Sequence, residues 1–125
     1  MAKHHSPRFL AIVDDAKTRI QETSSLELKR KLETDSNFHL IDVREADEYS
    51  AGHLPRARHL CKEILERDME TIVPDFDAEV VLYCGGGFRS ALAADNLQKM
   101  GYRRMLSLAE SWRRWQEAGF PVEKT

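Results

Sequence analysis

Apolar residues recur along the chain in two patterns, which predict strands and helices. Short runs rich in β-branched and other apolar residues predict strands at 38–43, 57–60, 80–83 and 104–108. Apolar residues at helical spacing predict helices at 7–21, 26–32, 46–51, 62–68, 91–100 and 111–118, the second of them capped by Ser25. Because strands alternate with helices, we expect one α/β unit whose central parallel sheet is flanked by helices on both faces.

Length and charge narrow the function classes. The chain has 125 residues, which is enough for one domain with a buried core. Its formal net charge of −2 at pH 7 gives no reason to expect a nucleic-acid partner. No apolar run approaches the roughly 20 residues of a membrane-spanning helix. No apolar signal segment follows the polar N-terminus either, so neither membrane attachment nor export is expected.

The most informative segment is 80–90, which reads VVLYCGGGFRS. An apolar run brings Cys84 to the C-terminal end of a predicted strand, and three glycines, Phe88 and Arg89 then lead into a predicted helix. Glycines let consecutive backbone N–H groups turn inward, and with a helix N-terminus such groups form an anion cradle. A thiol in that cradle, beside an arginine, is expected to be largely thiolate near neutral pH. The segment therefore predicts a nucleophilic sulfur for an anionic or electrophilic substrate.

Further segments carry a resemblance to a known family. They are LIDVRE at 40–45, EY at 48–49, GHLP at 52–55 and WQEAGFPV at 115–122. Together with the cysteine loop, and in this order, they resemble a single-domain rhodanese over about residues 22–123. The resemblance implies a rhodanese-like domain at 22–125, preceded by an N-terminal helical extension at 1–21.

The resemblance implies a sulfurtransferase of the thiosulfate (rhodanese) type. Cys84 would be the catalytic nucleophile and would carry a sulfane sulfur as a persulfide, taken from a small anionic donor such as thiosulfate or a persulfide. Backbone amides would cradle the substrate, and they belong to Gly85, Gly86, Gly87, Phe88 and Arg89. A thiophilic acceptor would then take the sulfur: cyanide in vitro, and a thiol or a sulfur-carrier protein in the cell. This chemistry requires no cofactor and no metal ion.

Two other functions remain open. One is a non-catalytic rhodanese-like module that uses the loop to bind a partner protein, although the intact cysteine counts against it. The other is a cysteine enzyme of the phosphatase or arsenate-reductase kind. Such phosphatases have one more residue between the cysteine and the arginine than the four between Cys84 and Arg89. Their wider loop fits a tetrahedral phosphate, so the loop length here favours sulfur.

Two charged residues, Asp42 and Arg44, come at the end of an earlier predicted strand, on the same sheet edge as the cysteine loop. From the residues alone, the simplest interpretation is an ion pair or a turn cap. The resemblance implies in addition that Asp42 supports the active-site region. Both residues are therefore candidates for a supporting role, whereas Glu48 is expected to be a structural charge on a helix face.

The chain departs from the family near the expected site. Glu110 and Ser111 stand where the family commonly has a glycine pair, so the pocket wall is expected to differ, and a carboxylate there would repel thiosulfate. Cys61 stands where a proline is common and is expected to be a buried spare thiol. Cys61 and Cys84 lie far apart in the sequence and form no disulfide framework. Because a reactive thiol suits a reducing compartment, we expect a cytoplasmic location.

Overall fold

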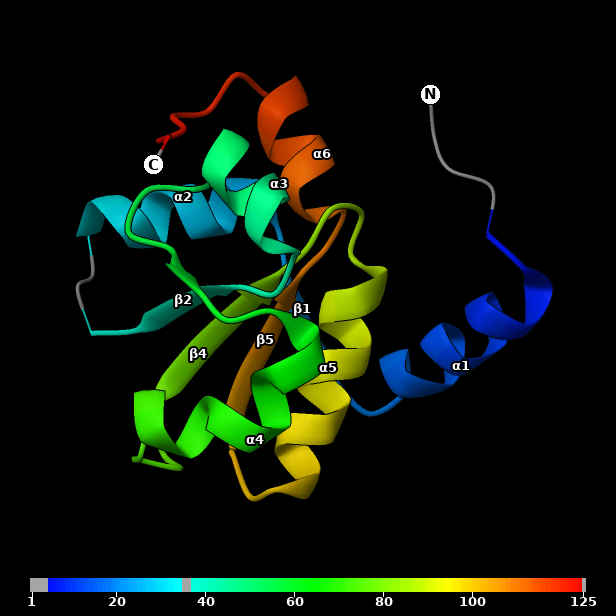
Figure 1. Ribbon diagram of the computed structural model, residues 1–125. Coiled ribbons are helices and arrows are strands. Elements are labelled where there is room, and N and C mark those ends of the chain that lie inside the picture. Colours follow the sequence, from blue (N-terminus) through cyan, green and yellow to red (C-terminus); the bar gives the residue numbers. More distant parts are fainter. Residues whose placement is uncertain (1–4, 35–36, 125) are drawn as a thin grey trace.

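The computed structural model describes residues 5–34 and 37–124, which form a five-stranded sheet and six helices in those ranges (Figure 1). The strands are β1 (Gln21–Thr23), β2 (His39–Asp42), β3 (Arg58–His59), β4 (Glu79–Tyr83) and β5 (Arg104–Leu108). The helices are α1 (Pro7–Lys17), α2 (Ser25–Thr34), α3 (Ala46–Ala51), α4 (Lys62–Ile72), α5 (Phe88–Lys99) and α6 (Ser111–Glu117). All strands are parallel, in the order β1-β5-β4-β2-β3, which confirms the predicted parallel α/β architecture.

The two faces of the sheet bury two separate cores. Alternate residues of β4 point to opposite faces, as the period of a strand requires. Val80 and Leu82 pack with residues of α4 and α5, whereas Val81 and Tyr83 pack with residues of α2 and α6. Because both faces are covered, the central strand β4 carries an unbroken apolar run at 80–83 rather than an alternating pattern. Helix α1 lies outside this arrangement and packs on α5 (Figure 1).

The N-terminal part of the domain differs from the sequence prediction. The helix expected over 7–21 ends at Lys17, and residues Gln21–Thr23 form β1, which pairs with β5. β1 was not predicted because its three residues are all polar, as suits an edge strand with two exposed positions. The predicted division at residues 21 and 22 stays a prediction.

The cap of α2 is Ser24 rather than Ser25. The backbone N–H of Glu27 donates to Ser24 Oγ at 3.1 Å, and the Glu27 carboxylate accepts from the Ser24 backbone N–H at 3.2 Å. This reciprocal pair is a capping box. Ser25 is instead the first residue of α2, where its side chain is buried. Among the described residues, no helix is long and apolar enough to cross a membrane.

The carboxyl ends of the central strands meet at one edge of the sheet and position the site. β4 ends at Tyr83, Cys84 follows, and α5 begins at Phe88. The neighbouring β2 ends at Asp42, directly before Val43, whose N–H donates to Tyr83 O at 3.0 Å. In parallel α/β sheets, ligands bind outside this edge.

Candidate active site

The sulfur of Cys84 lies inside a loop of inward-pointing backbone amides. The N–H of Gly87 donates to Sγ at 3.1 Å and the N–H of Ser90 at 3.4 Å, while Cys84 is only 1% exposed. Gly87 has φ = 97°, and a Cβ on it would lie 3.1 Å from the backbone nitrogen of Glu110. A side chain at position 87 is therefore disfavoured both by backbone conformation and by the close approach of Glu110. The N–H groups of Gly87 and Ser90 can stabilise negative charge on the sulfur. Gly87 belongs to the predicted cradle of residues 85–89 and Ser90 follows it, and substrate binding by residues 85–89 stays a prediction.

The first turn of α6 holds the loop from the other side. The backbone N–H of Cys84 donates to Ser111 Oγ at 3.2 Å. The N–H groups of Trp112 and Arg113 donate to the carbonyls of Cys84 and Gly85, each at 3.0 Å. Peptide groups on both sides of the cysteine are thus fixed by α6, which leaves the loop little freedom to move.

Arg89 closes the loop through an ion pair with Glu48. Its NH1 donates to Oε1 at 3.1 Å and its NH2 to Oε2 at 3.4 Å. Burial alone would raise the pKa of Glu48, but the hydrogen bonds from Arg89 and from the Glu45 N–H lower it on balance. Burial alone would lower the pKa of Arg89. The hydrogen bond to Glu48 and the nearby Cys84 sulfur outweigh this effect, so the pKa of Arg89 is raised. Glu48, expected to be a structural charge on a helix face, lies on α3 and is the partner of the loop arginine.

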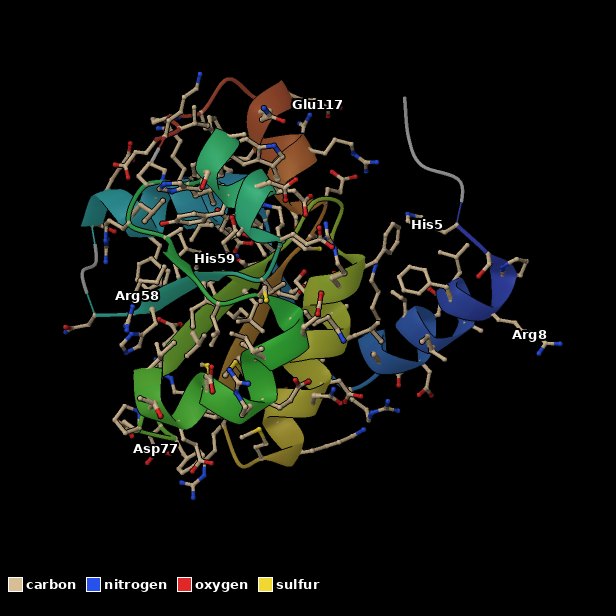
Figure 2. All side chains as sticks on the ribbon, viewed as in Figure 1. His5, Arg8, Arg58, His59, Asp77 and Glu117 are labelled. Carbon is tan, nitrogen blue, oxygen red and sulfur yellow. The ribbon has the colours of Figure 1, made fainter. Side chains whose placement is uncertain are left out.

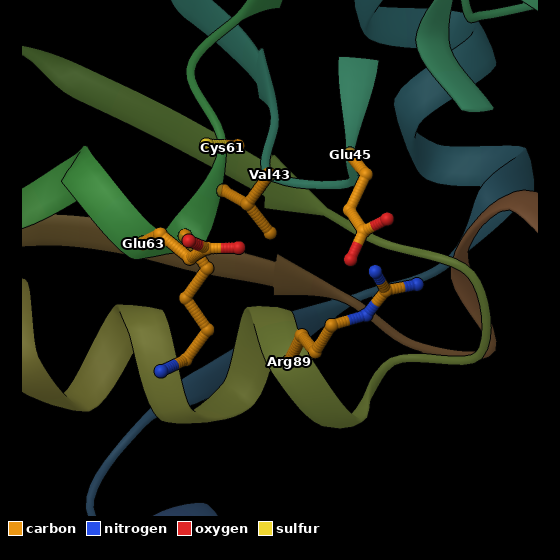
Figure 3. A pocket seen from close by; sticks show the side chains of 6 residues that line it. Val43, Glu45, Cys61, Glu63 and Arg89 are labelled. Atoms are coloured by element: carbon orange, nitrogen blue, oxygen red, sulfur yellow. The ribbon is translucent and has the colours of Figure 1, made fainter. Parts of the chain in front are cut away.

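A cavity of about 190 Å³ lies beside the loop (Figure 3). It is lined by Val43, Glu45, Cys61, Lys62, Glu63 and Arg89. Figure 3 shows the side chains of Glu45 and Arg89 pointing toward one another. Cys61 was expected to be buried, but it is partly exposed in this wall, because it comes directly before α4 at the open edge of the sheet. Glu110 is exposed and is not one of the lining residues.

Asp42 and Arg44 form the predicted ion pair and turn cap, with both side chains buried. The Arg44 guanidinium donates to the Asp42 carboxylate at 2.7 Å and to the carbonyl of Gly52 at 2.6 Å. The Arg44 backbone N–H also donates to Asp42 Oδ1, at 2.9 Å. The guanidinium lies 4.5 Å from the ring of Trp112, and the backbone N–H of Trp112 donates to the Cys84 carbonyl. The Arg44 guanidinium also lies 5.6 Å from the ring of Tyr83, the residue before Cys84. The pair therefore reaches the loop through Trp112 and Tyr83, and its supporting role stays a prediction.

Phe88 connects the loop to α1. Its ring lies 4.7 Å from that of His5 and 6.2 Å from that of Phe9, and Lys17 Nζ is 5.7 Å from its centre. Figure 2 shows His5 at the start of α1. On the other side, a Cβ on Gly86 would lie 3.7 Å from the Phe88 ring. Phe88 is not one of the residues that line the cavity, and its ring lies between the loop and α1.

Two serines near the sulfur were not predicted. Ser90 and Ser107 are fully buried, and their hydroxyl oxygens lie 2.8 Å apart. Ser90 Oγ is also 3.6 Å from Cys84 Sγ. The available signal was Ser107 itself, because it is a polar residue among the apolar residues at 105–108 of β5.

Comparisons with known proteins agree with the resemblance seen in the sequence. A family model of the rhodanese-like domain matches residues 24–118. YtwF of Bacillus subtilis, a candidate sulfurtransferase by name, is 38% identical over 84 residues, which cover 67% of this chain and 80% of that protein. A sulfurtransferase of Allochromatium vinosum is 32% identical over 103 residues, covering 82% of this chain and 94% of the relative. The thiosulfate sulfurtransferase GlpE of Actinobacillus succinogenes is 33% identical over 87 residues, covering 70% and 77%.

Solved structures share the fold along nearly the whole chain. A protein of unknown function from Rhodopseudomonas palustris, described as a possible tyrosine phosphatase, matches with a TM-score of 0.87 and 26% identity, covering 98% of this chain and 99% of that one. The polysulfide-sulfur transferase homodimer of Wolinella succinogenes matches with a TM-score of 0.80 and 26% identity, covering 94% and 88%. Because the family model spans most of the chain and two curated relatives are 38% and 32% identical to it, the chain belongs to the rhodanese-like domain family.

Proposed function

We propose that the protein is a sulfurtransferase that moves a sulfane sulfur through a persulfide on Cys84. The observation that carries the proposal is the cradle, in which the N–H groups of Gly87 and Ser90 donate to Sγ at the start of α5. These donors and the N-terminus of α5 can stabilise negative charge on the sulfur during the reaction. The names of the relatives support the same class of reaction.

In the first half of the reaction, the Cys84 thiolate attacks the outer sulfur of the donor. With thiosulfate, the new Sγ–S bond forms as the S–S bond of the donor breaks, and the electron pair of that bond leaves with sulfite. The enzyme then holds a persulfide whose terminal sulfur carries the negative charge. We propose that the amides of residues 85–89 stabilise that charge. The N–H of Gly87 already points at Sγ before the reaction begins, as does the N–H of Ser90.

In the second half, an acceptor takes the terminal sulfur. A thiolate or cyanide ion attacks that sulfur, the Sγ–S bond breaks, and its electron pair returns to Cys84 as a thiolate. The products are a persulfide of the acceptor thiol or thiocyanate. The cavity beside the loop is the proposed place for this acceptor, because Arg89 belongs to both the loop and the cavity wall.

The charges around the cavity suit a sulfur donor of low charge at least as well as the dianion thiosulfate. Glu48 takes both ends of the Arg89 guanidinium, and Glu45 faces the same group, so little positive charge is left for a dianion (Figure 3). Lys62 and Glu63 contribute opposite charges to the wall. We therefore propose a small persulfide or a protein-borne persulfide as donor in the cell, with thiosulfate as a usable donor in vitro.

Partners and location follow from this chemistry as proposals. A thiol or a sulfur-carrier protein is the proposed acceptor, and a relative from Bacillus subtilis is itself named as a candidate sulfur carrier. A cytoplasmic location, without nucleic-acid or membrane partners, stays a prediction from the sequence.

The phosphatase alternative is favoured by one observation, the description of the Rhodopseudomonas palustris structure. The loop length speaks against it, because only four residues separate Cys84 from Arg89. In addition, Arg89 is engaged with Glu48 rather than free to hold a phosphate. A non-catalytic binding module remains the third candidate, and an active thiol would exclude it.

Steady-state assays separate these functions. We expect the wild-type protein to form thiocyanate from thiosulfate and cyanide, and Cys84→Ser to form none. Cys61→Ser is the matched control and should keep the activity. Hydrolysis of p-nitrophenyl phosphate that depends on Cys84, without thiocyanate formation, would replace the proposal with the phosphatase.

A further inference from the structure

Behind the sulfur, two buried hydroxyl groups form a chain that leads away from Cys84. Ser90 Oγ lies 3.6 Å from Cys84 Sγ, and Ser107 Oγ lies 2.8 Å from Ser90 Oγ. Ser90 is in the first turn of α5, and Ser107 is on β5, the strand next to β4. None of the three side chains is more than 1% exposed. Solvent therefore does not reach these groups, and if one hydroxyl is removed, water does not take its place as the hydrogen-bond partner of the other.

The direction of hydrogen bonding in this chain depends on the charge of the sulfur. A hydroxyl has one proton to donate, and rotation about its C–O bond redirects that proton without moving a heavy atom. When Cys84 is a thiol, S–H can donate to Ser90 and Ser90 to Ser107. When Cys84 is a thiolate, Ser90 must donate to Sγ. The interaction between the two oxygens is then kept only if Ser107 donates to Ser90.

We propose that Ser107 is a positioning residue that turns the Ser90 hydroxyl toward Cys84 when the sulfur is negatively charged. Ser107 acts through Ser90 and does not touch the sulfur. A hydrogen bond to an ionised acceptor is stronger than one between neutral groups, so the donation has most effect in the thiolate state. The kinetic part of this inference rests on the proposed sulfur transfer, whereas the effect on the thiol itself does not.

The two halves of the reaction should respond differently. During transfer to an acceptor, the Sγ–S bond breaks and its electron pair becomes the charge on Cys84, which Ser90 then receives with a hydrogen bond. During loading, the same hydrogen bond stabilises the attacking thiolate and makes it a slightly weaker nucleophile. At a pH where Cys84 is ionised, loss of Ser107 should therefore slow the release of sulfur more than its loading.

The first test needs no sulfur transfer. The rate of Cys84 alkylation by iodoacetamide is followed against pH on the Cys84 peptide, so that Cys61 does not contribute. We expect the midpoint of the profile to move to higher pH in Ser107→Ala and further in Ser90→Ala. Ser107→Thr keeps the hydroxyl and should stay near the wild type. The matched control is Ser25→Ala, because Ser25 is also buried and its Oγ has no hydrogen-bond partner among the residues that the structure describes.

The second test separates the half-reactions. Persulfide-loaded wild-type and Ser107→Ala proteins are mixed with cyanide in a single turnover, and loading by thiosulfate is timed separately above the alkylation midpoint. We expect release to be slower by about three- to tenfold in Ser107→Ala, the size of one weakened charged hydrogen bond, and loading to be unchanged or slightly faster. Equal alkylation profiles in wild type and Ser107→Ala would overturn the inference, as would an equal shift in Ser25→Ala. A shifted profile in a protein that transfers no sulfur would uphold the hydroxyl chain and reject the proposed function.

Discussion

Ser111 accepts a hydrogen bond from the backbone N–H of Cys84 through its hydroxyl oxygen, at 3.2 Å. The same hydroxyl donates to the carbonyl of Leu108 at 2.7 Å. In this position Ser111 has φ = 43°, a left-handed conformation that is unfavourable for any residue with a Cβ. A residue that replaces a glycine common in the family thus gives the loop a contact that glycine cannot make.

Substitution of Ser111 should separate the hydrogen bond from the strain. Ser111→Ala keeps the strain and leaves the buried Cys84 N–H without its partner, so the free energy of unfolding should fall by about 1–3 kcal/mol. Ser111→Gly loses the same bond but relieves the strained φ, and should be less destabilised than Ser111→Ala. Urea unfolding of the three proteins measures both differences. Equal stability of Ser111→Ala and wild type would show that the hydroxyl does not support the loop.

The buried pair of Asp42 and Arg44 should matter far more than a surface pair. Asp42→Asn removes the charge that compensates the buried Arg44 guanidinium, and we expect a loss of about 3–5 kcal/mol in unfolding free energy. Asp77→Asn is the matched control, because its ion pair with Arg103 is exposed and should change stability little. The comparison uses the same urea titrations. Similar losses of unfolding free energy in the two variants would show that burial does not make the Asp42–Arg44 pair more important than an exposed one.

Acid should weaken the contact between Glu48 and Arg89. The pKa of Glu48 is lower in the folded protein than its ordinary value of 4.5, so the unfolded chain takes up the proton first as the pH falls. The contribution of Glu48 to stability is therefore complete well above pH 4.5 and is lost as the pH drops through the folded pKa. Unfolding free energies of wild type and Glu48→Gln, measured from pH 7 to pH 3, should differ by a small amount that shrinks in acid. If the difference in unfolding free energy between wild type and Glu48→Gln grew as the pH fell, ionised Glu48 would not be stabilising the fold.

Arg19 should anchor α1 to the body of the domain. Its guanidinium donates to both oxygens of the nearly buried Asp95 on α5, at 3.0 and 2.8 Å, and to Asp15 at 2.8 Å. In Arg19→Ala we expect faster hydrogen–deuterium exchange over residues 7–17 and little change in β4. Arg8→Ala is the control, because Arg8 is an exposed residue of α1 (Figure 2). Unchanged exchange in Arg19→Ala would mean that the apolar contacts of Val13 and Ala16 suffice to hold α1.

The local parts of the site could be predicted from the sequence, and the long-range parts could not. The strand, the glycines and the start of α5 are consecutive, so their arrangement around Cys84 follows from local conformational preferences. By contrast, Glu48 meets Arg89 across 41 positions, and the ring of Phe88 meets α1 only after the sheet has formed. β1 escaped prediction for a related reason, because its polar residues pair with β5 only through backbone hydrogen bonds.

The central claim is that Cys84 carries the transferred sulfur. Intact-mass spectrometry of wild type, Cys84→Ala and Cys61→Ala after incubation with thiosulfate, and again after added cyanide, tests it most directly. The account predicts an adduct of roughly 32 Da on wild type and Cys61→Ala, removed by cyanide, and none on Cys84→Ala. The absence of an adduct on the wild type, with thiosulfate and with a persulfide donor alike, would contradict the account, as would an adduct that persists in Cys84→Ala.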